Sequence, residues 1–213
     1  MPEQLLTTKN NTRDNLLAGY VIPVLPVKVI VESGQGQLSR GAALGQKTRA
    51  LGAATPGGGN VGNGTIGSVA MRAKTKKGVY SVVFIGANDF RVFDPEGVEL
   101  KRGVVGSLYS TDFIQFQITA GGTLFSSDDQ FTIIINAGNE KFVHSAAAAV
   151  DGSAEIRRIL AVDVDATSSD VDSEGYLQGE FNKERVNLNT HALADVQEAL
   201  EARRIFIKPV IKN

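Results

Sequence analysis

The chain has 213 residues, of which 42% are hydrophobic, enough for one large or two small domains with a buried core. Lysine and arginine together number 22 and aspartate and glutamate 23, so the positive surplus typical of nucleic-acid-binding proteins is missing. The absence of cysteine excludes disulfides, thiolate zinc sites and cysteine nucleophiles, and fits assembly in a reducing cytoplasm. No apolar run approaches the ~20 residues of a membrane helix, so we expect neither a nucleic acid nor a membrane as partner.

The first 19 residues are polar and have no periodic apolar face. Such a segment cannot bury enough surface to order by itself, so residues 1–19 are predicted to be a flexible arm that orders on a partner. Four leucines in this arm have no evident use inside the protein, and we predict that they anchor it to that partner. They are Leu5, Leu6, Leu16 and Leu17.

Residues 20–31 form an apolar segment interrupted by Pro23 and Pro26, which predicts an edge strand or an extended crossing. Glycine then dominates residues 55–67, and this composition predicts a flexible joint with a domain boundary.

Residues 58–139 alternate with period two, as half-buried antiparallel strands do. Turn signals recur at intervals of roughly 8 to 15 residues, which is typical of a β-sandwich. The alternating apolar sets are Tyr80, Val82 and Phe84, then Ile114, Phe116 and Ile118, then Phe131, Ile133 and Ile135. This pattern predicts an antiparallel β-sandwich over 58–139, inserted between two parts of another unit, 20–57 and 140–213.

The part from 140 to 213 reads as a second β-rich block with a short amphipathic helix. Leu193, Val196 and Leu200 recur at helical spacing, and Thr190 is a candidate N-cap. The predicted fold class is therefore mainly β, a small β-rich core with one or two short helices, interrupted by an inserted β-sandwich.

Gly62, Gly64 and Gly67 match the G-x-G-x-x-G pattern of dinucleotide-binding loops, with Asp89 downstream. That mechanism needs a buried strand before the glycines and a helix after them, whereas here a glycine-rich stretch precedes and β-like sequence follows. We therefore expect no cofactor.

Acidic residues crowd the segment 163–174, and Asp163 and Glu174 have the spacing of the first and twelfth positions of a calcium-binding EF-hand loop. Ser168 occupies the position that needs glycine, so we favour a solvated loop and predict no metal site, with calcium as the open alternative.

Neither His144 nor His191 accompanies a nucleophile motif. The basic residues of segment 72–77 are interpreted as a solvated hairpin turn, with a phosphate or glycan contact as the alternative. No catalytic residue is predicted, and the protein is not expected to be an enzyme.

Several blocks outside the predicted insert carry a family resemblance. Residues 29–35 read Val-Ile-Val-Glu-Ser-Gly-Gln and residues 38–45 read Leu-Ser-Arg-Gly-Ala-Ala-Leu-Gly. Residues 159–167, 179–182, 193–200 and 205–207 follow in order. Together they resemble the phage lambda-type head decoration proteins, in two pieces separated by the predicted insert. Arg204 stands where that family commonly has glycine before the final strand.

The resemblance implies a non-enzymatic virion protein, made in the host cytoplasm, that binds the major capsid protein on the outer capsid surface. It further implies a homotrimer at three-fold sites that stabilises the expanded shell, with the N-terminal arm ordering against capsid protein. The alternative is a carbohydrate- or receptor-binding β-sandwich protein of a phage tail or adhesin. Tryptophan is absent and the insert's aromatic residues fall mostly on the core alternation, which weighs against a glycan-binding platform.

Overall fold

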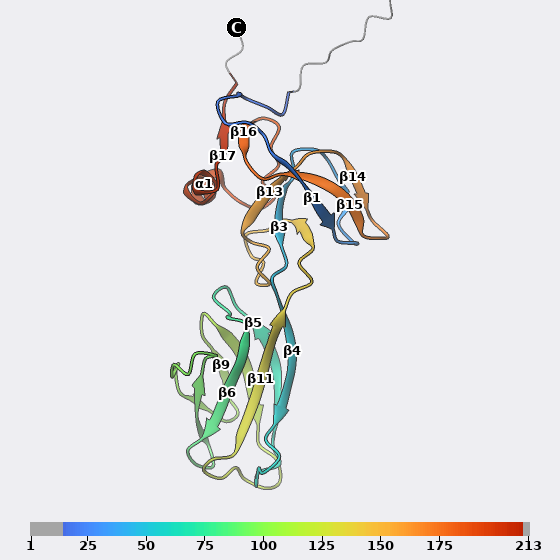
Figure 1. Ribbon diagram of the computed structural model, residues 1–213. Helices are drawn as coiled ribbons and strands as arrows, with labels where there is room; N and C mark the ends of the chain where they lie inside the picture. Colours follow the sequence, from blue (N-terminus) through green and yellow to red (C-terminus); the bar gives the residue numbers. More distant parts are fainter. Residues whose placement is uncertain (1–14, 211–213) are drawn as a thin grey trace, which may run out of the picture.

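The computed structural model describes residues 15–210 and is mainly β, as predicted, with one short helix in the described chain (Figure 1). The elements in chain order are β1 (Pro26–Val31), β2 (Gly36–Leu38), β3 (Ala43–Gln46), β4 (Arg49–Pro56), β5 (Thr65–Met71), β6 (Gly78–Phe84), β7 (Asp89–Phe93), β8 (Gly103–Val104), β9 (Leu108–Ser110), β10 (Ile114–Thr119), β11 (Gln130–Ala137), β12 (Phe142–His144), β13 (Ile156–Leu160), β14 (Val164–Ala166), β15 (Val171–Tyr176), β16 (Gly179–Asn182), α1 (Leu193–Ala202) and β17 (Ile205–Lys208).

Both ends of the described chain belong to one unit, which we call the barrel unit. Its centre is a closed barrel in the order β1-β12-β3-β13-β15, where β1 and β12 run parallel and the other reported pairs are antiparallel. Two short pairs flank the barrel: antiparallel β2 and β14, and parallel β16 and β17. Closure leaves the five barrel strands without a free edge, which protects them from pairing with other chains.

Helix α1 confirms the helix predicted from the spacing of Leu193, Val196 and Leu200. All three side chains pack in one apolar cluster of the barrel unit, and Leu200 is buried. The predicted cap is wrong. The N-cap is Ala192, which makes no side-chain cap hydrogen bond, while the Thr190 hydroxyl accepts a hydrogen bond from the Ala147 N–H at 2.9 Å.

Arg204 ends the helix in the left-handed conformation that glycine usually provides. Its φ is 62°, and its N–H donates to the Glu201 carbonyl at 2.8 Å. The turn before β17 therefore keeps the geometry of a glycine cap although the residue is arginine, whose Cβ makes that geometry more costly.

The remaining strands, β4 to β11, form a second unit that we call the sandwich. Two antiparallel sheets, β5-β10-β9 and β4-β11-β6-β7-β8, enclose one apolar core. The nine residues of the three predicted alternating sets are all buried in that core. Aromatic rings fill its centre; Phe84 stacks on Phe125 with ring centroids 3.9 Å apart. The period-two prediction is confirmed because apolar side chains on alternate positions all face the same core.

The sandwich begins earlier than the sequence predicted. Strand β4 pairs with β11 from Pro56↔Phe131 to Arg49↔Ala137, so the chain enters this unit near residue 48 rather than residue 58. The small residues of β4 carry little period-two signal, because only Ala54 packs against the core.

The glycine-rich stretch is a loop at the far end of the sandwich and not a joint between units. The buried Asp129 carboxylate accepts hydrogen bonds from the N–H groups of Val61 and Gly62, both at 2.8 Å, and of Ser126 at 3.0 Å. Burial alone would raise the pKa of Asp129, but these backbone donors outweigh it and lower that pKa. One carboxylate thus orders a segment whose composition predicts flexibility.

Within residues 15–210, no helix is long and apolar enough to cross a membrane.

The sandwich core shares no residue with the two apolar clusters of the barrel unit. Replacing residues 48–138 by a short Asn-Gly-containing turn should therefore leave a folded barrel unit, because Lys47 already pairs with Glu140 and Lys141 across the cut. Calorimetry should show one cooperative transition, and two-dimensional NMR should keep the dispersed barrel signals. A molten product without a cooperative transition would contradict this expectation.

Candidate functional site

The four leucines predicted to bind a partner have different fates. Leu5 and Leu6 lie outside the described residues. Leu16 is 1% exposed and packs with Phe181, Leu200 and other residues of a barrel-unit cluster, and Leu17 packs partly against the same cluster. Leu16 thus serves the protein's own core, a role that differs from the predicted one.

Residues 15–19, predicted to belong to a flexible arm, pair with strand β16. The Asn182 N–H donates to the Leu16 carbonyl at 2.8 Å, and the Ala18 N–H donates to the Glu180 carbonyl at 2.9 Å. The Asn182 side-chain amide also donates to the Asn15 carbonyl at 2.9 Å. Together with the bridge between Leu17 and Phe181, these bonds place an extended segment beside β16, antiparallel to it.

Glu180 holds the next residues of this segment against the end of the barrel unit. Its side chain is almost fully buried, and its carboxylate accepts hydrogen bonds from the Lys208 ammonium and, at 3.1 Å, from the Val21 N–H. The Lys208 ammonium is the main cause that holds the pKa of Glu180 below its usual range. A Cβ at Gly19 would lie 2.1 Å from the Oε2 of the same carboxylate, so a larger residue there would have to displace the Glu180 side chain.

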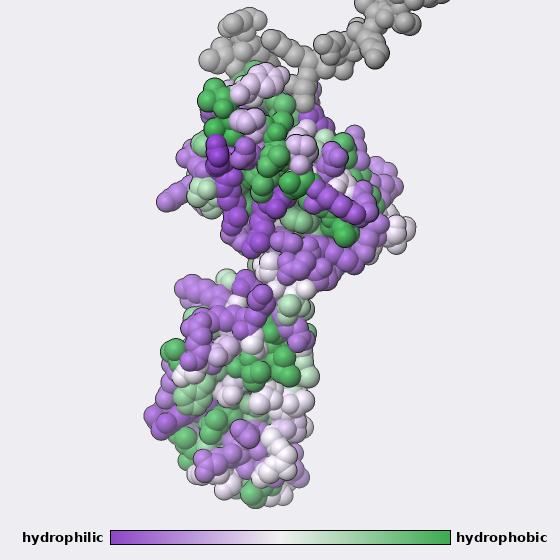
Figure 2. Space-filling model, in the orientation of Figure 1, coloured by the Kyte–Doolittle hydropathy of each residue, from purple (hydrophilic) through white to green (hydrophobic). Residues whose placement is uncertain are grey.

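We call residues 15–25 together with β16 and β17 the terminal pole. Here the described chain starts and ends, and Tyr20 and Val21 are 80% and 85% exposed. Leu25 and Val210 are further exposed apolar residues at this end. Figure 2 shows hydrophobic surface at this end of the molecule. These exposed apolar side chains make the terminal pole a candidate interaction surface.

The carboxylates of the acidic segment 163–174 bind separate backbone N–H groups. Asp163 accepts the Arg40 N–H at 2.6 Å, Asp165 accepts the Thr167 N–H at 3.1 Å, and Asp170 accepts the Ser33 N–H at 2.9 Å. Across residues 15–210 there is no group of three or more His, Cys, Asp or Glu side chains that could hold a metal ion. These carboxylates instead fix separate turns.

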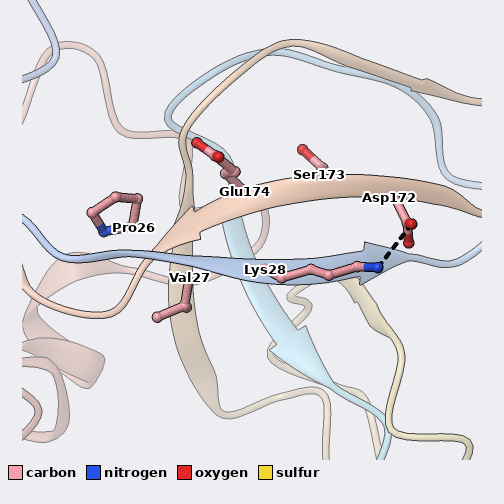
Figure 3. A pocket seen from close by; sticks show the side chains of 6 residues that line it. All are labelled: Pro26, Val27, Lys28, Asp172, Ser173 and Glu174. Atoms are coloured by element: carbon pink, nitrogen blue, oxygen red, sulfur yellow. Dashed lines mark hydrogen bonds and ion pairs between the residues drawn. The ribbon is translucent and has the colours of Figure 1, made fainter.

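A shallow groove of about 360 Å³ runs between β1 and β15 (Figure 3). Its one ion pair joins the Lys28 Nζ to the Asp172 Oδ2 at 2.8 Å, with both side chains about two-thirds exposed. Exposed pairs of this kind contribute little, and the groove is open and without convergent polar groups. It offers no built binding site.

The other motifs also lack the arrangement that their chemistry needs. Gly67 lies inside strand β5, so no helix follows the G-x-G-x-x-G sequence. In the basic segment 72–77, Lys74 pairs with Asp112, and Lys76 pairs with Asp94 and Glu96. These ion pairs fit the predicted hairpin turn.

One polar contact, between Ser145 and His191, was not predicted from the sequence. The Ser145 Oγ lies 2.9 Å from the His191 Nε2, and it donates to the Ser153 carbonyl at 2.8 Å. Burial lowers the pKa of His191. Ser145 is 0% exposed and uses its proton on a backbone carbonyl, so the pair joins two loops and cannot attack a substrate. No local motif reveals it, because 46 positions separate the two residues.

The described residues thus form two β-rich units with exposed apolar side chains at the terminal pole. The family described as Bacteriophage lambda head decoration protein D matches residues 5–205, and the chain belongs to this family. The family is structural and non-enzymatic and decorates phage capsids, which confirms the resemblance and assigns the protein to the capsid surface of a virion.

Other comparisons add little. No curated protein matches the sequence. Two crystal structures of Xanthomonas campestris FlgL, in space groups H3 and C2, are each 19% identical to it with a TM-score of 0.33. The matches cover 48% and 51% of this chain and 33% of the FlgL chain, so this protein spans about a third of that length. A similarity this low carries no functional argument.

Leu16→Ala should destabilise the barrel unit by about 2–5 kcal/mol, because it opens a cavity in a packed cluster. The matched control Leu124→Ala, at an exposed leucine of the sandwich, should change stability by less than about 0.5 kcal/mol. Urea unfolding followed by the amide NMR signals of each unit measures both. Equal effects of the two substitutions would show that residues 15–19 are not packed on β16.

Proposed function

We propose that the protein binds the outer surface of an expanded phage capsid as a homotrimer at three-fold sites and stabilises that shell. The observation that carries this proposal is the match of the decoration-protein family to nearly the whole chain, residues 5–205. A closed three-fold assembly suits such a site, because its symmetry lets each copy make the same contact with the major capsid protein.

Stabilisation of the shell needs no catalysis. A protein that binds the assembled lattice, and not the free capsid protein, shifts the equilibrium toward the lattice by mass action. Three linked copies raise the effective affinity further, because the second and third contacts form within one complex.

The terminal pole is the proposed docking surface. Tyr20 and Val21 offer exposed apolar contacts there, and the segment before residue 15 continues from the same place. In the bound state this segment adds a strand to an edge in the capsid protein, with Leu5 and Leu6 as its anchors. Leu16 and Leu17 then contribute indirectly, because they fix the point on β16 from which the segment leaves.

We also propose that the two units have different roles. The barrel unit and the terminal segment form the decoration core, and the sandwich is an inserted domain with its own apolar core. Docking therefore depends on the terminal pole and not on the sandwich.

Deleting residues 2–14 should abolish or severely weaken binding to expanded empty capsids in a pelleting assay, because the lost contacts exist only in the complex. Thermal stability should stay unchanged, since the cut spares Asn15 and Leu16, which contact Asn182. A variant with a Gly/Ser sequence of the same length at positions 2–14 tests whether the side chains matter, and it should also fail to bind. Unchanged pelleting of both variants would contradict the docking role of the segment, and failure of the intact protein to bind expanded capsids would contradict the proposed function.

A further inference from the structure

The terminal pole and the sandwich lie at opposite ends of the molecule. Figure 1 shows β16, β17 and the first described residues at one end, the barrel between, and the sandwich at the other end. Whatever the terminal pole contacts, the loops at the far end of the sandwich are the part of the described chain most distant from that contact.

Two segments connect the units, residues 47–48 and 138–141, and backbone hydrogen bonds at Lys47 join them. Gln46 pairs with Phe142 in the barrel, and Arg49 pairs with Ala137 in the sandwich. Between these pairs the Lys47 N–H donates to the Lys141 carbonyl at 2.9 Å, and the Glu140 N–H donates to the Lys47 carbonyl at 3.0 Å. The crossing is therefore a two-stranded ribbon whose two segments are joined by backbone hydrogen bonds at Lys47.

Close backbone contact tightens this ribbon. A Cβ at Gly138 would lie 2.1 Å from the Lys47 carbonyl oxygen, so the two segments approach to a distance that only glycine permits. The N–H groups of Thr48 and Arg49 both donate to the Asp151 carbonyl, at 2.9 and 3.0 Å, and tie the ribbon to the barrel unit.

The Arg49 guanidinium joins the two units directly. Its Nε donates to the Val150 carbonyl of the barrel unit at 2.8 Å. Its other nitrogens donate to the Ala73 carbonyl at 3.2 Å and to the Thr75 carbonyl, both in the loop between β5 and β6 of the sandwich. Because the guanidinium is a planar, rigid fork of donors, three simultaneous bonds fix the direction of the sandwich relative to the barrel.

We propose that the sandwich is an outward-facing head on the decorated capsid, pointing away from the shell. The ribbon and Arg49 hold it opposite the terminal pole. This inference rests on the proposed function, because the terminal pole must face the shell. The outermost surface of the virion at these sites is then the tip, which we define as loops 57–64, 85–88 and 120–129.

The tip is one connected surface. The Thr123 N–H donates to the Asn63 side-chain oxygen at 2.8 Å, and the Asp128 N–H donates to the Phe84 carbonyl beside loop 85–88 at 3.0 Å. Its residues include two ionisable side chains, and because Asp129 is buried only Asp128 is exposed. Val61 and Leu124 are more than 60% exposed there. The head therefore presents an ordered, nearly uncharged end to solution.

The absence of native cysteine allows a direct test with two matched variants, Val61→Cys at the tip and Val21→Cys at the terminal pole. Both valines are exposed in the free protein, at 63% and 85%. Each variant is first pelleted with expanded capsids to show that it binds. The rate at which a fluorescent maleimide labels the variant is then measured for the free and for the capsid-bound protein. The fluorescence is read on the gel band of the decoration protein. Val61→Cys should label at the same rate in both states, whereas capsid binding should slow labelling of Val21→Cys by about tenfold or more, because thiol reactivity requires access.

The outcomes separate the two proposals. Protection of Val61→Cys on the shell, or unchanged labelling of Val21→Cys, would overturn the outward orientation even though the protein decorates capsids. Failure of the intact protein to pellet with expanded capsids would instead overturn the proposed function. If Val21→Cys alone fails to pellet, Tyr20→Cys replaces it as the probe of the same pole.

Discussion

The paired crossing of two chain segments, around Lys47 and around Gly138, governs the architecture of this protein. Because only these two chain segments lead from the barrel unit to the sandwich, the apolar cores of the two units share no residue. Each unit must therefore close its own core, the barrel by joining its strands into a ring and the sandwich by packing two sheets. The proposed insertion fits this arrangement, since the two chain segments leave the barrel unit side by side.

The terminal pole follows from a second constraint, the need to pair strand β16. Parallel β17 covers one edge of β16, and residues 15–18 lie along the other. The start and the end of the described chain are thereby brought to one place, far from the sandwich. Buried Glu180 is stable there because Lys208 and backbone N–H groups satisfy its charge. The same pairing that completes the fold thus determines which end of the molecule can present the N-terminal segment to a capsid.

Local patterns in the sequence predicted the features that depend on neighbouring residues. The alternation of Ile114, Phe116 and Ile118 identifies a strand with one buried face, and the spacing of Leu193, Val196 and Leu200 identifies the helix. Ordered blocks such as 29–35 and 205–207 indicated the family, and the family match over residues 5–205 confirms that resemblance.

Contacts between distant residues were beyond such patterns. Leu16 is buried because Phe181 lies beside it, and no local sequence pattern in residues 1–19 predicts that contact. The glycine-rich loop is ordered because Asp129, nearly 70 positions away, binds its backbone N–H groups. Strand β4 was missed for a related reason: its small side chains add little to the core, and its pairing with β11 comes from the backbone.

The most direct test of the account is a cryo-electron microscopy reconstruction of expanded capsids decorated with the intact protein. The account predicts trimeric density at three-fold positions, with the terminal pole against the shell and three sandwiches projecting outward. Residues before Asn15 should then be resolved against a strand of the capsid protein. Density that places the sandwich on the shell, or that shows single copies away from the three-fold positions, would contradict it.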